Sequence, residues 1–387
     1  MAQAAAQPST QPRNFGFGED ERALKDIAQK FFQDNLPSKR LHTLVAADSS
    51  VKRAGQCCWD QELWQQVVDL GWLLTAVPER AGGLGMSAVA VTGLVEEVGR
   101  AAFPCPLLST LNATYILAAC NSQPADEALG HIAQGKSFSY ASSNRHGSLE
   151  HDESELRVEN GILRGNIYFV QEAQKVNYFL INAKADGEVV LYVIDARIKG
   201  LSINPDSIVD LTRDQATLVF HNVEVEASQL VSSGVEAFTA LVTATPALLV
   251  ILAADMCGAA EWQLQTTAEY ARTRQQFDRT IGFFQAVKHP LVEFMVEIDQ
   301  ARSLLYNAAC AIDHEPDMAE QYARMAKAVA NDAVGFGSRK SVQLHGGIGF
   351  TWECYIHLYL KRQLHSQVLL GDATYHRAKL AELVLSS

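Results

Sequence analysis

The chain has 387 residues, of which 48% are hydrophobic and 20% are charged, and its length predicts two or three domains of an ordinary soluble protein. Its formal net charge of −12 excludes a general affinity for nucleic acid or for an anionic membrane surface, because such affinity depends on clustered Lys and Arg. The seven cysteines form neither a CxxC pair nor a metal-ligand spacing, so no metal site is predicted.

The first 134 residues predict a short lead followed by a helical domain. Residues 1–16 lack the basic segment and apolar run of a signal peptide, so we expect a disordered lead and a cytoplasmic protein. Apolar residues then recur at helical spacing over 19–35 and 59–71, and two further helices are expected at 88–99 and 107–119. Residues 17–134 are therefore predicted to form an N-terminal helical domain.

The periodicity changes near residue 137, where short runs of β-branched and aromatic residues begin. They continue to Val225 and are separated by turn signals such as Glu159-Asn160-Gly161 and Asp186-Gly187, the second of which is a two-residue hairpin candidate. Because no helical pattern intervenes, we expect residues 135–232 to form a central antiparallel β domain, either a barrel or a sandwich.

The helical period returns for the last 150 residues. Residues 235–274, 286–313, 319–344 and 373–386 predict long helices and a C-terminal four-helix bundle over residues 233–387. The most apolar stretch contains three threonines and Pro246, so no membrane span is predicted. Gly346 and Gly347 each cost a helix about 1 kcal/mol. A helix end, close helix packing or contact with a ligand would each account for them.

Five motifs stand out by their combination. They are VPERAGGLG at 77–85, EEVGR at 96–100, YARTRQQF at 270–277, IGFFQAVKH at 281–289 and QLHGGIGFTWE at 343–353. Together with the order of helices, strands and helices, they resemble the acyl-CoA dehydrogenase family of flavoproteins from about Phe15 onward. The resemblance implies an FAD cofactor and an acyl-CoA substrate. A carboxylate takes the α-proton of the substrate, and the β-hydrogen leaves as hydride to the flavin.

The resemblance also implies that part of the FAD site is donated across a subunit interface. Arg274 is then the partner of the FAD pyrophosphate, since a guanidinium suits phosphate oxygens. Phe277 and Gln285 line the adenosine side, and three further residues let the backbone approach the cofactor: Gln343, Gly346 and Gly347. On residue type alone, a solvated charge on a helix is the simpler explanation of Arg274, and the full motif favours the FAD contact.

Two other parts of the family pattern are missing. The acidic, glycine-rich flavin loop is replaced by residues 141–149, and the Trp-Ile-Thr segment at the flavin reads Phe169-Val170-Gln171. Leu370-Gly371 stands where many members carry the Glu-Gly of the catalytic base, and the second family location of the base, residues 246–250, has no acid. Asp372 is the remaining candidate base, with a helix N-cap as its alternative role. Weaker candidate proton acceptors are Asp255, Glu261, His345, His365 and His376.

This combination resembles the partner subunit, lacking the base, of heteromeric α2β2 acyl-CoA dehydrogenases of bacterial steroid side-chain degradation. It implies a second acyl-CoA dehydrogenase-type subunit that holds the base, an acyl-CoA substrate of which a steroid side-chain CoA ester is one candidate, and an electron-transferring flavoprotein as acceptor. Two alternatives stay open. One is a self-sufficient homotetrameric dehydrogenase that uses Asp372 or another carboxylate as base, and the other is a non-enzymatic scaffold or CoA-ester-binding relative.

Overall fold

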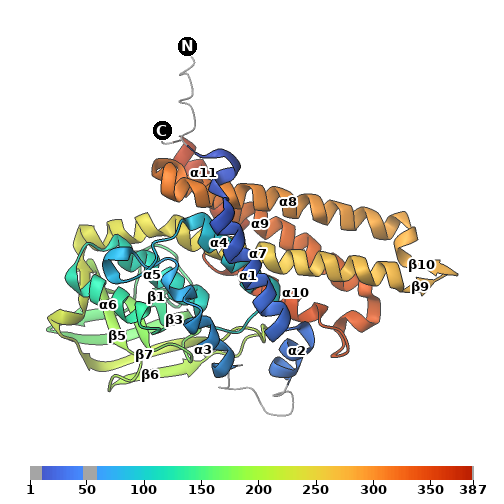
Figure 1. The fold of residues 1–387 in the computed structure, drawn as a ribbon. Helices are drawn as coiled ribbons and strands as arrows, with labels where there is room; N and C mark the ends of the chain where they lie inside the picture. Colours follow the sequence, from blue (N-terminus) through green and yellow to red (C-terminus); the bar gives the residue numbers. More distant parts are fainter. Residues whose placement is uncertain (1–10, 47–58, 386–387) are drawn as a thin grey trace, which may run out of the picture.

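The computed structural model describes residues 11–46 and 59–385, and its helices and strands follow the predicted order (Figure 1). Of the predicted disordered lead, residues 1–10 lie outside the described residues. The prediction is wrong for its end, because Arg13–Gly16 form a 3-10 helix (η1). The physical reason is Phe15, whose side chain packs against the main hydrophobic core. The proposed division of the chain at residues 134/135 and 232/233 stays a prediction.

The N-terminal helices are α1 (Glu19–Asn35), α2 (Ser38–Ala46), α3 (Gln61–Asp69), α4 (Ala88–Ala101), α5 (Leu107–Ala119) and α6 (Gln123–Ala133). Almost every residue of α4 is buried. It crosses the long helix α7 (Gly234–Thr273) where two glycines face the opposing backbone. A Cβ on Gly99 would lie 2.1 Å from the carbonyl oxygen of Asp255. A Cβ on Gly258 would lie 1.8 Å from the carbonyl oxygen of Glu96. Both glycines are therefore required by the close approach of the two helices.

The central strands are β1 (Phe138–Ala141), β2 (Arg157–Glu159), β3 (Ile162–Gln171), β4 (Tyr178–Ala185), β5 (Glu188–Asp195), β6 (Leu201–Pro205), β7 (Gln215–Glu224) and β8 (Leu230–Ser233). They form one sheet in the order β6-β7-β3-β2-β4-β5-β8, with β1 paired to β4. The expected hairpin at Asp186-Gly187 is confirmed, since both residues have positive φ and Ala185 pairs with Glu188.

The expectation of purely antiparallel strands needs one correction. β1 and β2 both run parallel to β4, so the sheet is mixed. The connection from β1 to β2 is a long loop over residues 142–156, and a long connection allows the strands to run in parallel where a short hairpin would not. Ser142 and Leu149 of this loop line two cavities between the β domain and the C-terminal helices.

The C-terminal helices are α7, α8 (Gln285–His314), α9 (Pro316–His345), α10 (Ile356–Val368) and α11 (Ala373–Leu385). In Figure 1, α7, α8 and α9 run side by side to a tip formed by the short strands β9 (Gln275–Gln276) and β10 (Arg279–Thr280). By length and composition α7 could cross a membrane, but 72% of its most apolar window is buried, as in the core helix of a folded domain. The predicted fold class, mainly helical with a central β domain, is confirmed.

Candidate functional site

The six residues expected to contact FAD lie at the tip of the bundle, far from the sheet. Arg274 follows the last residue of α7, Phe277 is on the β9–β10 hairpin and Gln285 begins α8. The other three, Gln343, Gly346 and Gly347, are at the end of α9. All six are exposed in the chain. The structure therefore brings the expected residues together on one surface that the chain itself leaves open.

Local contacts hold this surface in shape. The imidazole of His345 stacks on the Tyr270 ring at a centroid distance of 4.4 Å, which joins the ends of α7 and α9. Gly282 packs against the backbone of α7, because a Cβ on Gly282 would lie only 2.9 Å from the carbonyl oxygen of Ala271. Phe277 adopts a φ of 55° and is 83% exposed. A large aromatic ring held in an uncommon backbone conformation and left in water indicates a surface that another molecule covers.

Gly346 and Gly347 directly follow the last residue of α9. Gly346 has φ 66° and ψ −146°, a conformation that is essentially restricted to glycine, and it terminates α9. A Cβ placed on Gly346 or Gly347 would meet nothing within 4 Å. Close packing of one helix against another therefore does not explain the two glycines. They mark the end of α9 and leave its backbone accessible.

Two cavities lie between the β domain and the C-terminal helices. The larger, about 710 Å³, has one wall from α11, and we call it the α11 cavity. The smaller, about 430 Å³, is lined by the end of β3, and we call it the β3 cavity. The cavities share five lining residues, which mark the divide between them: Tyr140, Ser142, Leu149, Leu248 and Leu370.

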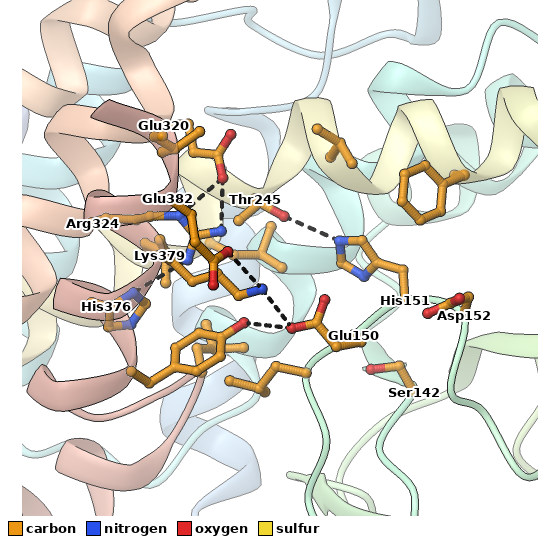
Figure 2. A pocket seen from close by; sticks show the side chains of 18 of the residues that line it. Ser142, Glu150, His151, Asp152, Thr245, Glu320, Arg324, His376, Lys379 and Glu382 are labelled. Carbon is orange, nitrogen blue, oxygen red and sulfur yellow. Dashed lines mark hydrogen bonds and ion pairs between the residues drawn. The ribbon is translucent and has the colours of Figure 1, made fainter. Parts of the chain in front are cut away.

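Charged side chains from three elements meet in the α11 cavity (Figure 2). Lys379 of α11 donates to Glu150 of the β1–β2 loop at 3.0 Å and lies 3.4 Å from Glu382. Arg324 of α9 donates to Glu320 through two nitrogens, at 2.9 and 2.7 Å. The hydrogen bond from Lys379 lowers the pKa of Glu150, so this carboxylate is a poor proton acceptor.

The β3 cavity lies where the sequence departs from the family pattern. Phe169 and Gln171 line it, and the Gln171 amide bonds to the Phe169 carbonyl and to Gln215, at 3.0 and 2.9 Å. Arg213 and Arg362 also line it, each buried and paired to Asp255. Asp255 is thus committed to two ion pairs, and it lines neither cavity.

Leu370 occupies the divide between the cavities, at the position aligned with the family base. It has a φ of 55° in the loop between α10 and α11. The neighbouring candidate base, Asp372, is exposed and accepts a hydrogen bond from the Tyr375 backbone N–H at 2.8 Å, so it caps α11. It lines neither cavity. Leu370, and not the neighbouring carboxylate of Asp372, therefore lines both cavities at this point.

The remaining candidate proton acceptors have other partners. Glu261 pairs with Arg302 at 2.9 Å on the surface of the bundle. His345 takes part in the stack on Tyr270, and burial lowers its pKa. His365 faces Asp210 at 3.3 Å. His376 lines the α11 cavity, and burial lowers its pKa to about 4, so it is uncharged at neutral pH.

Sequence reasoning did not single out the charged residues of the α11 cavity. Tyr375, Lys379 and Glu382 are spaced by four and three positions, which places them on one face of α11, and this was the available signal. Glu150, in a long loop, carried no such signal. The buried Glu172 of the β3 cavity was also missed; its pKa is raised, chiefly by burial.

The residues at the tip fit an FAD pyrophosphate and adenosine. Arg274 makes no ion pair with any described residue, and open space surrounds Gly346 and Gly347. The β3 cavity has room for a planar ring, but it lacks the acidic, glycine-rich loop of the family pattern, and Gln171 stands where that pattern has a threonine hydroxyl. The chain therefore offers a better fit to one half of the cofactor than to the other.

Comparison with known proteins agrees with this geometry. Residues 18–136 match the acyl-CoA dehydrogenase N-terminal domain and residues 250–385 match the acyl-CoA dehydrogenase C-terminal domain. The acyl-CoA dehydrogenase IpdE2 of Mycobacterium tuberculosis is 32% identical over 313 residues, which cover 81% of this chain and 83% of that protein.

Solved structures show the same fold. The ChsE4–ChsE5 complex of Mycobacterium tuberculosis superposes with a TM-score of 0.85 at 23% identity, covering 97% of this chain and 99% of that one. A variant of the Tcur3481–Tcur3483 steroid acyl-CoA dehydrogenase gives a TM-score of 0.82 at 26% identity, covering 96% and 99%. The chain belongs to the acyl-CoA dehydrogenase family, whose cofactor is FAD.

Proposed function

We propose that this chain is the completing subunit of a heteromeric FAD-dependent acyl-CoA dehydrogenase. In this assembly it would supply the pyrophosphate and adenosine contacts of an FAD whose flavin ring is held by a second, related subunit. That second subunit would carry the carboxylate base. In the reaction of the family, the base takes the α-proton of an acyl-CoA and the flavin is the hydride acceptor.

The separation of the two half-sites along α7 is the observation that carries the proposal. Leu252 of α7 lines the β3 cavity, whereas Arg274 follows the end of the same helix 22 residues later. At 1.5 Å per residue this is about 33 Å, so the tip residues and the chain's own cavity cannot serve the same cofactor. The tip residues therefore suit an FAD bound mainly by another polypeptide.

The apolar divide between the cavities supports a partner that is different from this chain. In a homo-oligomer every subunit would carry Leu370 at the position of the base, and Asp372 caps a helix instead of lining a cavity. The exposed aromatic rings near the tip, Phe277, Phe283 and Phe350, offer an apolar surface for that partner. These features support a partner of a different kind, and the α2β2 stoichiometry that we propose rests on the resemblance to heteromeric members of the family.

The finer assignments rest on the resemblance drawn from the sequence and on one named relative. The Tcur3481–Tcur3483 steroid dehydrogenase variant supports a role in steroid breakdown, with a steroid-derived CoA ester as substrate. We further propose an electron-transferring flavoprotein as the electron acceptor and the cytoplasm as the location.

The test is to purify the chain alone and together with its partner, and to compare FAD content and dehydrogenase activity. The chain alone should retain little FAD and show no activity, and the complex should be yellow and active. A yellow, active assembly of this chain alone would contradict the proposal. The partner to test is a second family member that keeps the acidic flavin loop and a carboxylate base, and the genes next to that of this chain are the place to look for it.

A further inference from the structure

The surface proposed for FAD at the tip, which we call the FAD surface, combines two parts that come from different helices. Arg274 follows the last residue of α7, and Gly346 and Gly347 follow the last residue of α9. All three are exposed, and a Cβ on either glycine would meet nothing within 4 Å. A guanidinium and an open backbone can hold one pyrophosphate only if their separation is right to within about 0.5 Å. The FAD surface therefore depends on the contacts that fix the two helix ends relative to each other.

Tyr270 belongs to the last turn of α7 and fixes the place where that helix ends. Its backbone carbonyl accepts the N–H of Arg274 at 2.8 Å, and the carbonyl of Arg274 accepts the N–H of Ile281 at 2.9 Å. Arg274 has an extended conformation, with φ −68° and ψ 127°, so the chain leaves the helix at this residue. Arg274 is thus held by Tyr270 on one side and by the residue after the β9–β10 hairpin on the other.

His345 has the corresponding place on α9. It is the last residue of that helix and is only 5% exposed. Its Nδ1–H donates to the Ser341 carbonyl oxygen at 2.7 Å, which holds the ring against its own helix. Burial lowers the pKa of His345, so the imidazole is uncharged at neutral pH. The open backbone that starts at Gly346 therefore lies one residue after a fixed ring.

The two rings stack on each other and join the two helix ends. Their centroids are 4.4 Å apart and their planes are tilted by 20°, as in a stacked aromatic pair. The Tyr270 hydroxyl also donates to the His345 carbonyl at 3.5 Å. Among the described residues, this is the ring contact that joins α7 to α9. Neither residue is one of the six expected to contact FAD, but each lies within four residues of one that is.

We propose that Tyr270 and His345 are positioning residues of the FAD surface. Their stack sets the separation between Arg274 and the backbone of Gly346, and the affinity for FAD depends on that separation. Neither ring needs to touch the cofactor in this role. The inference rests on the proposed function, because it takes this chain to supply the pyrophosphate contacts of an FAD shared with a second subunit.

The test measures the FAD dissociation constant of the complex between this chain and its flavin-binding partner, by titrating FAD into the complex after the cofactor has been removed. Tyr270→Leu and His345→Leu each remove one ring of the stack and should weaken FAD binding at least about tenfold. Tyr270→Phe keeps the ring and should stay within about threefold of the wild type. Wild-type affinity in a folded leucine variant, or no recovery in Tyr270→Phe, would overturn the proposal.

A second ring stack on α7 provides the matched control. Trp262 stacks on Tyr359 of α10 with centroids 3.8 Å apart, at a point about 12 Å along the helix from Tyr270. Trp262→Leu should lower the melting temperature, as loss of any buried ring contact does, and should keep the FAD dissociation constant within about threefold of the wild type. If Trp262→Leu weakened FAD binding as much as Tyr270→Leu, a general loss of stability would explain both results, and the proposal would be wrong.

A double-mutant cycle with Arg274→Ala shows whether the stack acts through Arg274. If it does, Tyr270→Leu should change FAD affinity by less than about threefold once the guanidinium is gone. The same fold-change in both backgrounds would overturn the proposal. An Arg274→Ala complex that binds FAD as the wild type does would contradict the proposed function itself. A strong effect of Arg274→Ala without any effect of Tyr270→Leu would contradict the positioning role alone.

Discussion

Lys327 makes the stability of the protein depend on pH in a way that can be measured. Its side chain is fully buried on α9 and donates to the Asn331 amide oxygen at 2.7 Å and to the carbonyl oxygens of Gly371 and Ser366, at 3.0 and 3.2 Å. None of these acceptors carries a charge. Burial therefore lowers the pKa of Lys327 to about 7, although Asp372 lies near enough to oppose the shift.

The sign of the effect follows from the two protonation states. The unfolded chain has a lysine with the ordinary pKa of 10.5, so between about pH 7 and 10 it binds one more proton than the folded chain. Stability should then rise with pH by up to about 1.4 kcal/mol per unit. From about pH 7 to pH 8.5 we expect the free energy of unfolding to increase by about 1.5 kcal/mol. The range from pH 7 to 8.5 lies above the ordinary pKa of histidine and at or below that of a thiol, so Lys327 dominates the change in stability there.

The assay is urea unfolding of the wild type and of Lys327→Met at several pH values in that window. Methionine keeps the length of the side chain and removes the titrating group, so the slope with pH should vanish. The absolute stability of the variant can move either way, because a buried charge and several hydrogen bonds are lost together. Lys199→Met, at an exposed position, should keep the wild-type slope. A flat wild-type profile, or a variant with the same slope, would refute the reasoning.

Three further outcomes are expected. Arg274→Ala should reduce the FAD retained by the proposed complex, measured by absorbance after gel filtration, whereas Arg272→Ala, two positions earlier and 75% exposed, should not. Gly258→Ala should lower the free energy of unfolding, measured by thermal unfolding, by about 2–3 kcal/mol, because its Cβ would clash with the Glu96 carbonyl oxygen. Gly130→Ala is the control, because open space surrounds a Cβ at that position. Burial lowers the pKa of His357 and of His376 to about 4, so the melting temperature should fall as pH drops from about 6.5 to 4.5, and less steeply in His376→Gln.

Local sequence patterns predicted most of the regular elements. The helix expected over residues 19–35 has the bounds of α1, and the expected hairpin is present at Asp186-Gly187. The helix α10 was missed because its buried face contains His357, Arg362, Gln363 and Ser366, which interrupt the apolar period. The strand β6 was missed because most of its residues are exposed. Periodicity finds elements whose buried face is apolar, and it fails where that face is polar.

The site was predictable only where its residues are close in sequence. The surface proposed for FAD at the tip comes from three continuous motifs, two of them nearly adjacent in the sequence, and the structure brings all three to one place. The α11 cavity instead joins Glu150, Arg324 and Lys379, which come from a loop and two helices more than 50 residues apart along the chain. Contacts between such distant segments depend on the fold as a whole, and no local spacing records them.

The tip of the bundle and the α11 cavity differ in whether their exposed groups find partners within the chain. At the tip, the exposed Phe277 ring and the open backbone of Gly346 are left in water by this chain, which indicates a surface that another molecule covers. At the α11 cavity, the charges of Glu150, Glu320, Arg324 and Lys379 are satisfied within the chain, so that hollow needs no partner to be stable. Leu370 separates the second region from the β3 cavity without a group that could accept a proton. In the proposed function, Leu370 takes the place of the base, so this chain contributes its assembly surface at the tip and not the proton acceptor.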